Sequence, residues 1–317
     1  MGLISIDDVR AAREIIDGKL LRTPTITSET LGKRLGINLY LKAELFQKTG
    51  SFKVRGALNK LNSLSPEEKK VGVVAFSAGN HAAGLAYAAK LAGVKATIVM
   101  PETAVQSKVE ATRSYGGIVI LHGKPADLFP KVQELQREHG YTLIHPFDDP
   151  FTIAGQGTVG LEMLEDMPKP DVVVVPIGGG GLISGVGVVV ATMYPKTRVI
   201  GVEPVGAAGM RRALEAKAVV SLEKVETIAD GLGAPFAGVL NLEHVQKYVN
   251  DVVLVTDDEI ANGMRLLMER CKIVPEPAGA AAFAALLHSK FFVRPESTVA
   301  CIVSGGNVDM SRLKAIL

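Results

Sequence analysis

The residue with the clearest chemical potential in this chain is Lys53, which follows Thr49-Gly50-Ser51-Phe52. Apolar residues continue at helical spacing after it, at Val54, Ala57, Leu58 and Leu61, which predicts that Lys53 lies in the first turn of a helix. The positive end of the helix dipole disfavours a cation there, so this lysine is easier to neutralise, and a neutral amine is a nucleophile. The alternative is an ordinary exposed helix lysine.

Four consecutive glycines, Gly178 to Gly181, stand between a predicted strand and a predicted helix. Such a backbone can approach an anion closely and direct several N–H groups at it, as a phosphate site requires. A tight turn that needs positive φ would also explain glycine here. A dinucleotide site is a further alternative, because Glu203 follows at a suitable distance for a ribose, but Ser184 replaces the third glycine of G-x-G-x-x-G.

Two more turns follow predicted strands, Ser77-Ala78-Gly79-Asn80-His81 and Ser304-Gly305-Gly306-Asn307. The first opens a predicted helix, so its backbone donors suit a carboxylate, and the Asn80 amide can bond an oxygen atom. Simple N-capping by Ser77 or Asn80 is the alternative. In an open parallel sheet, ligands bind beyond the carboxyl ends of strands, so the three turns are expected to converge.

Strands and helices alternate along most of the chain, which predicts an α/β fold of mostly parallel sheets with helices on both faces. Thr256-Asp257-Asp258-Glu259 has the spacing of a helix capping box. The turn Phe147 to Pro150 is a candidate domain boundary. The predicted strands cover residues 39–44, 72–76, 96–100, 118–121, 171–175, 198–203, 252–255 and 298–303, and the predicted helices cover residues 6–17, 81–91, 108–115, 128–139, 153–166, 260–271 and 278–287 besides those that begin near Lys53 and Gly181.

Composition excludes several partners. The 317 residues carry a net charge of +2 without long runs of one sign, and tryptophan is absent, so no nucleic-acid partner is expected. The longest uncharged run, residues 172–195, is split by Pro176 and the glycines, so no membrane span is expected. Cys271 and Cys301 are isolated, and no signal peptide is visible at the N-terminus, which favours a reducing, cytoplasmic location.

An amine nucleophile, a phosphate site and a carboxylate site together suggest pyridoxal phosphate acting on an amino acid. The chain resembles the serine/threonine dehydratase and serine racemase family of fold-type II pyridoxal-phosphate enzymes. The resemblance covers nearly the whole chain. It is carried by residues 46–57, 77–81, 154–158, 176–182, 229–231 and 304–307, which match family motifs in family order.

The resemblance implies a role for each of these segments. Lys53 would carry the cofactor covalently, and the cofactor phosphate would bind Gly178, Gly179, Gly180, Gly181 and Leu182. Phe52 would line the ring, Asn80 would lie near the ring oxygen, and Ser304 would face the pyridine nitrogen. The substrate carboxylate would bind Ser77, Ala78, Gly79, Asn80 and His81. The implied fold has two open twisted sheets of the tryptophan synthase β type, with a large domain (1–70 and 148–317) enclosing a smaller mobile one (71–147).

The implied activity is elimination of water from L-threonine or L-serine, giving a 2-oxo acid and ammonia. A hydroxyl group at Ser304, unlike a carboxylate, leaves the pyridine nitrogen unprotonated, which favours elimination over transamination. Racemases of the family carry a serine where this chain has Ala78, so a dehydratase is preferred over the alternative, a serine racemase. More distant alternatives are a β-replacement synthase, a nicotinamide-dependent oxidoreductase and a non-catalytic binding protein.

The resemblance also bears on metals and assembly. The resemblance implies a divalent cation bound by Glu203 and the Ala207 carbonyl, which match part of a family cation site. Gly209 departs from this pattern, because some relatives have an aspartate there. Phe147 replaces an asparagine that helps bind nucleotide in racemases. A homo-oligomer, a dimer or a tetramer, is expected, because a dimer is common in the family.

Overall fold

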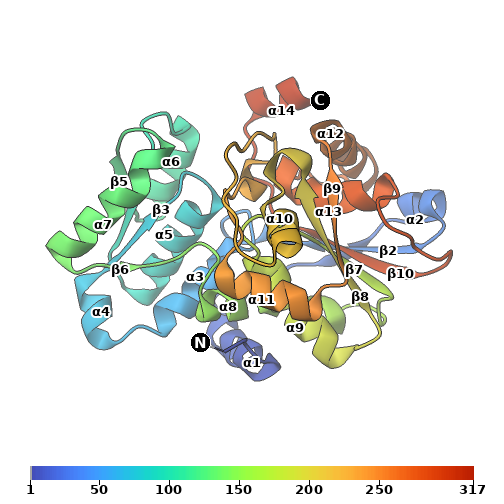
Figure 1. Cartoon of the computed structure of the whole chain (residues 1–317), viewed down its shortest axis with the longest axis horizontal. Helices are drawn as coiled ribbons and strands as arrows, with labels where there is room; N and C mark the ends of the chain where they lie inside the picture. Colours follow the sequence, from blue (N-terminus) through green and yellow to red (C-terminus); the bar gives the residue numbers. More distant parts are fainter. Residues whose placement is uncertain (1) are drawn as a thin grey trace.

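The structure, a computed structural model, describes residues 2–317 and consists of two sheets with helices around them (Figure 1). The larger sheet has the strand order β1-β2-β10-β7-β8-β9, and only its edge strand β1 is antiparallel to its neighbour. The smaller sheet has the order β5-β4-β3-β6 and is parallel throughout. This is the α/β architecture that the alternation of strands and helices predicts.

The strands of the larger sheet are β1 (Thr25–Thr27), β2 (Asn38–Ala43), β7 (Val172–Pro176), β8 (Arg198–Pro204), β9 (Asp251–Val255) and β10 (Thr298–Val303). Those of the smaller sheet are β3 (Val73–Phe76), β4 (Ala96–Met100), β5 (Ile118–Leu121) and β6 (Thr142–Leu143). All strands of the smaller sheet therefore come from one continuous stretch of the chain, which lies at the left of Figure 1.

Helices connect the strands and cover both sheets. Those before residue 150 are α1 (Ile6–Ile16), α2 (Glu29–Leu35), α3 (Lys53–Asn62), α4 (Pro66–Val71), α5 (Asn80–Ala92), α6 (Gln106–Ser114) and α7 (Leu128–His139). Those after it are α8 (Pro150–Glu165), α9 (Gly181–Met193), α10 (Gly209–Ala216), α11 (Val239–Tyr248), α12 (Asp257–Leu266), α13 (Pro277–Leu287) and α14 (Met310–Ile316). A π-helical turn, Leu267–Cys271, extends α12.

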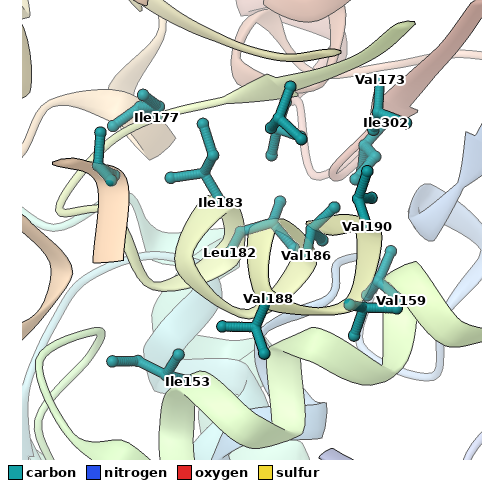
Figure 2. Packing of buried hydrophobic residues seen from close by; sticks show 14 of the residues in the cluster. Ile153, Val159, Val173, Ile177, Leu182, Ile183, Val186, Val188, Val190 and Ile302 are labelled. Atoms are coloured by element: carbon teal, nitrogen blue, oxygen red, sulfur yellow. The ribbon is translucent and has the colours of Figure 1, made fainter. Parts of the chain in front are cut away.

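The larger sheet is buried on both faces, because alternate residues of its central strands pack against different helices. Val173, Val175 and Ile302 face the cluster that contains α1, α8, α9 and α11, whereas Val172 and Val174 face α12 and α13. Figure 2 shows α9 lying between the sheet and α8 through Leu182, Ile183, Val186, Val188 and Val190. Such two-sided burial explains why these strands read as unbroken apolar runs.

The sequence predicted these central elements within a few residues, including the capping box of Thr256 and Glu259 at the start of α12.

The smaller sheet is also covered on both faces. Val73 and Ala75 of β3 pack toward α5 and α3, and Val74 packs toward α7. The sequence missed the short elements β1, α2, α4 and β6, and also α10, α11 and α14.

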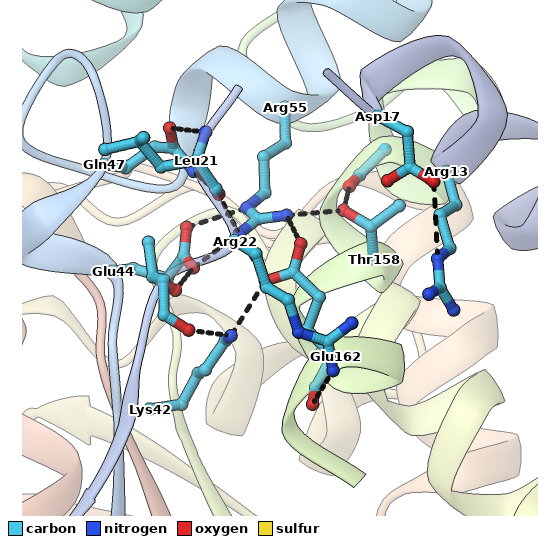
Figure 3. Close-up of polar contacts among 12 residues, drawn as sticks. Arg13, Asp17, Leu21, Arg22, Lys42, Glu44, Gln47, Arg55, Thr158 and Glu162 are labelled. Carbon is cyan, nitrogen blue, oxygen red and sulfur yellow. Dashed lines mark hydrogen bonds and ion pairs between the residues drawn. The ribbon is translucent and has the colours of Figure 1, made fainter. Parts of the chain in front are cut away.

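Four buried charges join α3 to the larger sheet and to α8 (Figure 3). The Arg55 guanidinium donates to both Glu44 oxygens at 2.8 Å and to the Glu162 oxygens at 2.6 and 2.8 Å. Lys42 Nζ donates to Glu162 at 2.8 Å. Two cations and two carboxylates balance, so each charge is compensated where water is excluded. Arg55 lies two residues after Lys53, and this cluster therefore fixes the first turn of α3.

Replacing Arg55 by methionine tests this cluster. Arg55→Met keeps much of the side-chain volume but leaves two buried carboxylates with one ammonium group, which should lower the free energy of unfolding by roughly 3–5 kcal/mol. Urea unfolding monitored by circular dichroism gives the value. The control is Lys33→Met, which removes an exposed ion pair with Glu29 and should cause no measurable loss. Equal effects of the two variants would contradict a structural role for the buried charges.

Candidate active site

The site is a cavity of about 480 Å³ that lies where several strands end. Ser77 follows β3, Gly178 follows β7 and Ser304 follows β10. The cavity is lined by every residue that the sequence proposed for cofactor and substrate: Phe52, Lys53, Ser77, Ala78, Gly79, Asn80, His81, Gly178, Gly179, Gly180, Gly181, Leu182 and Ser304. The three turns converge as a parallel sheet requires.

Lys53 is the first residue of α3, and its Nζ donates a hydrogen bond to the Pro146 carbonyl at 2.8 Å. Burial of the amine lowers its pKa from 10.5 to about 8. The direction agrees with the sequence prediction, but the cause is desolvation of the ammonium group. At pH 8 about half of the Lys53 amines are therefore neutral and nucleophilic.

The four glycines form the wall of the cavity at the start of α9. Gly180 has φ +103°, which favours glycine. A Cβ at Gly179 would lie 2.3 Å from the Phe147 ring, one at Gly180 2.7 Å from Asn241 Cβ, and one at Gly181 3.0 Å from the Phe147 carbonyl. Positive φ accounts for one glycine only, so the other contacts explain why the run exceeds the needs of a turn.

The turn at Ser77 leads into α5 without a side-chain cap. Gly79 is the N-cap residue, and within residues 2–317 no side chain caps the helix by accepting a hydrogen bond from the N–H groups of its first turn. Ser77 Oγ instead accepts from the Gly79 N–H at 3.2 Å. The alternative of simple capping by Ser77 or Asn80 is therefore wrong, and the first N–H groups of this 13-residue helix remain available to an anion in the cavity.

His81 is buried in the first turn of α5, and its Nε2–H donates to the Ile144 carbonyl at 3.1 Å. Burial lowers the pKa of His81 to about 3, so the ring is neutral. His81 therefore adds no charge to the carboxylate site.

Asn80 is held from two sides by residues of the larger-sheet part of the chain. Its Nδ2 donates to Glu276 Oε1 at 2.6 Å, and its Oδ1 accepts from Asn307 Nδ2 at 2.8 Å. Burial raises the pKa of Glu276 to about 7. The sequence analysis missed Glu276, although Pro277 after it marks a helix start.

Ser304 is buried at the end of β10, and its Oγ donates to the Ala278 carbonyl at 3.3 Å. The hydroxyl hydrogen can rotate about the Cβ–Oγ bond and donate instead to an acceptor in the cavity that Ser304 lines. A neutral hydroxyl at this position supplies a partner without a formal charge.

Glu203 and Ala207, the residues predicted to contribute to a cation site, do not line this cavity. The two Glu203 oxygens accept from the N–H groups of Met210 and Arg211 at 2.7 and 2.8 Å, at the start of α10. Burial raises the pKa of Glu203 to about 7. Residues 2–317 contain no group of three His, Cys, Asp or Glu side chains arranged to hold a metal ion.

Comparison with known proteins identifies the family. The model of the pyridoxal-phosphate dependent enzyme family matches residues 16–305. The chain belongs to this family. An L-threonine ammonia-lyase of Thermotoga maritima is 45% identical over 316 residues, which cover 99% of this chain and 78% of that protein.

Two solved structures share the fold. The structure of maize serine racemase superposes with a TM-score of 0.95 at 41% identity, covering 99% of this chain and 97% of that one. That of the processed form of threonine deaminase isoform 2 from Solanum lycopersicum has a TM-score of 0.93 at 37% identity, covering 98% and 91%. The backbone is therefore that of the fold-type II enzymes, but its similarity alone does not separate a racemase from a deaminase.

The residues of the cavity fit the cofactor of the family. Three features line the same cavity: an amine with a lowered pKa, a run of glycines at which an added Cβ would contact neighbouring residues too closely, and a buried hydroxyl. The amine can react with an aldehyde, the glycine backbone can bind a phosphate, and the hydroxyl can hydrogen-bond a ring nitrogen.

The lowered pKa of Lys53 predicts unusual reactivity in protein freed of cofactor. Because the neutral amine is the reactive form, acetylation of Lys53 should rise with pH to a midpoint near pH 8. Peptide mass spectrometry measures the modified fraction, and a short unstructured lysine peptide in the same tube, with a pKa of about 10.4, is the control. A midpoint for Lys53 equal to that of the peptide would contradict burial of the amine.

Proposed function

We propose that the protein is a pyridoxal-phosphate dependent threonine/serine ammonia-lyase, which removes water from the amino acid and yields a 2-oxo acid and ammonia. The observation that carries the proposal is the position of the Lys53 amine in one cavity with the tetraglycine turn and the start of α5. The name of the 45% identical relative, L-threonine ammonia-lyase, supports L-threonine as the first substrate to test.

In this proposal, Lys53 holds the cofactor covalently and Gly178 to Leu182 hold its phosphate. Phe52 lines the ring, Asn80 donates to the ring oxygen and Ser304 faces the pyridine nitrogen. Bound pyridoxal phosphate supplies an electron sink for the electrons released at the substrate α-carbon. The supporting features are the glycine contacts, the fixed amide of Asn80 and the neutral hydroxyl of Ser304.

The same chain residues bind the amino acid and move its proton. The turn from Ser77 to His81 binds the substrate carboxylate through the N–H groups of Ala78, Asn80 and His81, helped by the dipole of α5. The N–H groups of Ser77 and Gly79 already donate to the Val99 carbonyl and to Ser77 Oγ. The neutral Lys53 amine accepts the α-proton at Nζ, since a pKa of about 8 suits a base near neutral pH. Ala78 has no hydroxyl to handle a proton on the second face of the substrate, which favours elimination over racemisation.

The proposal extends to dynamics, assembly and location. Residues 71–147, which carry the smaller sheet, form a domain that closes over bound substrate and excludes water, while residues 1–70 and 148–317 form the large domain. The protein acts as a homo-oligomer in the cytoplasm. Within residues 2–317, every helix is too short or too polar to cross a membrane. The divalent cation is left out of the proposed activity, because both Glu203 oxygens already accept backbone hydrogen bonds.

Lys53→Ala tests the covalent role. The purified protein should show an absorbance band near the visible edge, and borohydride should abolish the band and add the cofactor mass to the Lys53 peptide. Lys53→Ala should lack this adduct and lose 2-oxo acid formation by about 10³-fold or more, because it loses its base and its attachment point. Lys48→Ala, which alters an exposed lysine outside the cavity, is the control. Near-normal turnover by Lys53→Ala would refute the proposal.

Product analysis separates the lyase from the racemase. With L-serine as substrate, pyruvate should exceed D-serine, because Ala78 has no group to return a proton to the second face of the substrate. Chiral chromatography and a pyruvate assay on the same samples measure both products. Dominant D-serine would establish the racemase instead, and kinetics on L-threonine and L-serine in parallel would rank the substrates.

A further inference from the structure

Asn241 lies behind the tetraglycine turn and contacts it from outside the cavity. It is fully buried in the first turn of α11, and its Nδ2 donates to the Gly179 carbonyl at 3.0 Å and to the Phe147 carbonyl at 3.1 Å. The Gly179 carbonyl also accepts from the Gly238 N–H at 3.0 Å. Two donors from the α11 side therefore hold this one carbonyl oxygen.

The orientation of the Asn241 amide is fixed by chemistry. If its oxygen and nitrogen were exchanged, the oxygen would face two carbonyl oxygens, which donate no hydrogen bond. Asn241 Oδ1 is buried and has no hydrogen-bond partner within residues 2–317. All of the hydrogen bonding by this side chain is therefore directed at Gly179 and Phe147.

A second contact fixes the position of α11 relative to the segment that contains Phe147. The Asp148 carboxylate accepts from the N–H groups of Val239 and Leu240, both at 3.0 Å, and so caps α11. A Cβ at Gly238 would lie 2.5 Å from both Asn241 Nδ2 and Asp148 Oδ1, so the chain enters the helix in close contact with both side chains. Asp148 and Asn241 thus attach α11 to the segment after Pro146, whose carbonyl binds Lys53.

The direction of the Gly179 carbonyl determines the direction of the next amide. In a trans peptide the N–H of Gly180 points opposite to the C=O of Gly179. The described residues contain no cis peptide bond. Gly179 and Gly180 line the cavity, whereas α11, all of whose residues the structure describes, contributes no residue to its lining. A carbonyl held toward α11 therefore turns the Gly180 N–H toward the cavity.

We propose that Asn241 is a positioning residue that turns the Gly180 N–H into the phosphate site, and that it selects for the phosphorylated form of the cofactor. The inference rests on the proposed function, because it assigns a device to the phosphate end of the same cavity. Without the Asn241 amide the Gly179 carbonyl keeps the Gly238 N–H as its one donor among residues 2–317, so the Gly179–Gly180 peptide is less restrained. A carbonyl turned into the cavity would repel the phosphate.

A comparison of two cofactor forms tests the role of Asn241. Absorbance titrations of cofactor-free full-length protein give dissociation constants for pyridoxal phosphate and for pyridoxal, which lacks the phosphate. In Asn241→Ala the constant for pyridoxal phosphate should rise about tenfold, as expected for loss of about two neutral hydrogen bonds, while that for pyridoxal should stay within about twofold. The ratio of the two constants is the decisive quantity, because a general loss of structure would weaken both.

Leu242→Ala is the matched control. Leu242 is the next residue of α11, is buried in the same core and makes no hydrogen bond to the turn through its side chain. This variant should lower the melting temperature but leave the ratio unchanged. If Asn241→Ala does not fold, Asn241→Asp, which keeps the volume but loses both donated bonds, provides the same comparison and should reduce the preference for the phosphate form further.

The outcomes separate this inference from the proposed function. An unchanged ratio in the Asn241 variants, or an equal change in Leu242→Ala, would overturn the positioning role and leave the proposed function intact. A wild-type protein that binds pyridoxal phosphate no more tightly than pyridoxal, and without attachment to Lys53, would overturn both.

Discussion

Burial of one amine is the constraint on which the rest of the site depends. An ammonium group in water gains solvation that it loses inside the protein, and among residues 2–317 the Lys53 amine has only the Pro146 carbonyl as a hydrogen-bond partner. The result is a lysine with a pKa of about 8, which can act as a nucleophile and as a base near neutral pH. The His81 ring beside it is neutral and adds no second positive charge.

The surrounding structure holds this amine in place from several directions. The four-charge cluster around Arg55 fixes the first turn of α3 against β2 and α8 (Figure 3). Gly84 allows α5 to pack closely against the first turn of α3, since a Cβ at Gly84 would lie 2.9 Å from the Val54 nitrogen. Asn241 and Asp148 connect the Pro146 segment to the tetraglycine turn. Elements distant in the sequence thus position the amine and the tetraglycine turn relative to each other.

The sequence predicted those parts of the molecule that depend on local patterns. The apolar spacing after Lys53, the long buried strands of the larger sheet and the capping box at Thr256 were all visible in the sequence, and the glycine run predicted an anion site. The helix α4 was missed even though Ser65 and Glu68 form a capping box at its start. The strands β1 and β6 are too short to show a period.

Other features depend on contacts that no local pattern records. The helix α11 is capped by Asp148, 91 residues before it, so the usual signal for a helix start is absent and Asn241 could not be recognised. Glu44 and Glu162 meet only around Arg55, and Glu276 reaches Asn80 across 196 residues. The cause of the lowered pKa of Lys53 was likewise hidden, because burial is a property of the assembled fold.

A crystal structure of the protein grown with pyridoxal phosphate tests the central claim most directly. The expected result is electron density that continues from Lys53 Nζ to the cofactor, with the phosphate bound by the backbone from Gly178 to Leu182. A cofactor that is not attached to Lys53, or a phosphate bound elsewhere, would contradict the assignment of this cavity.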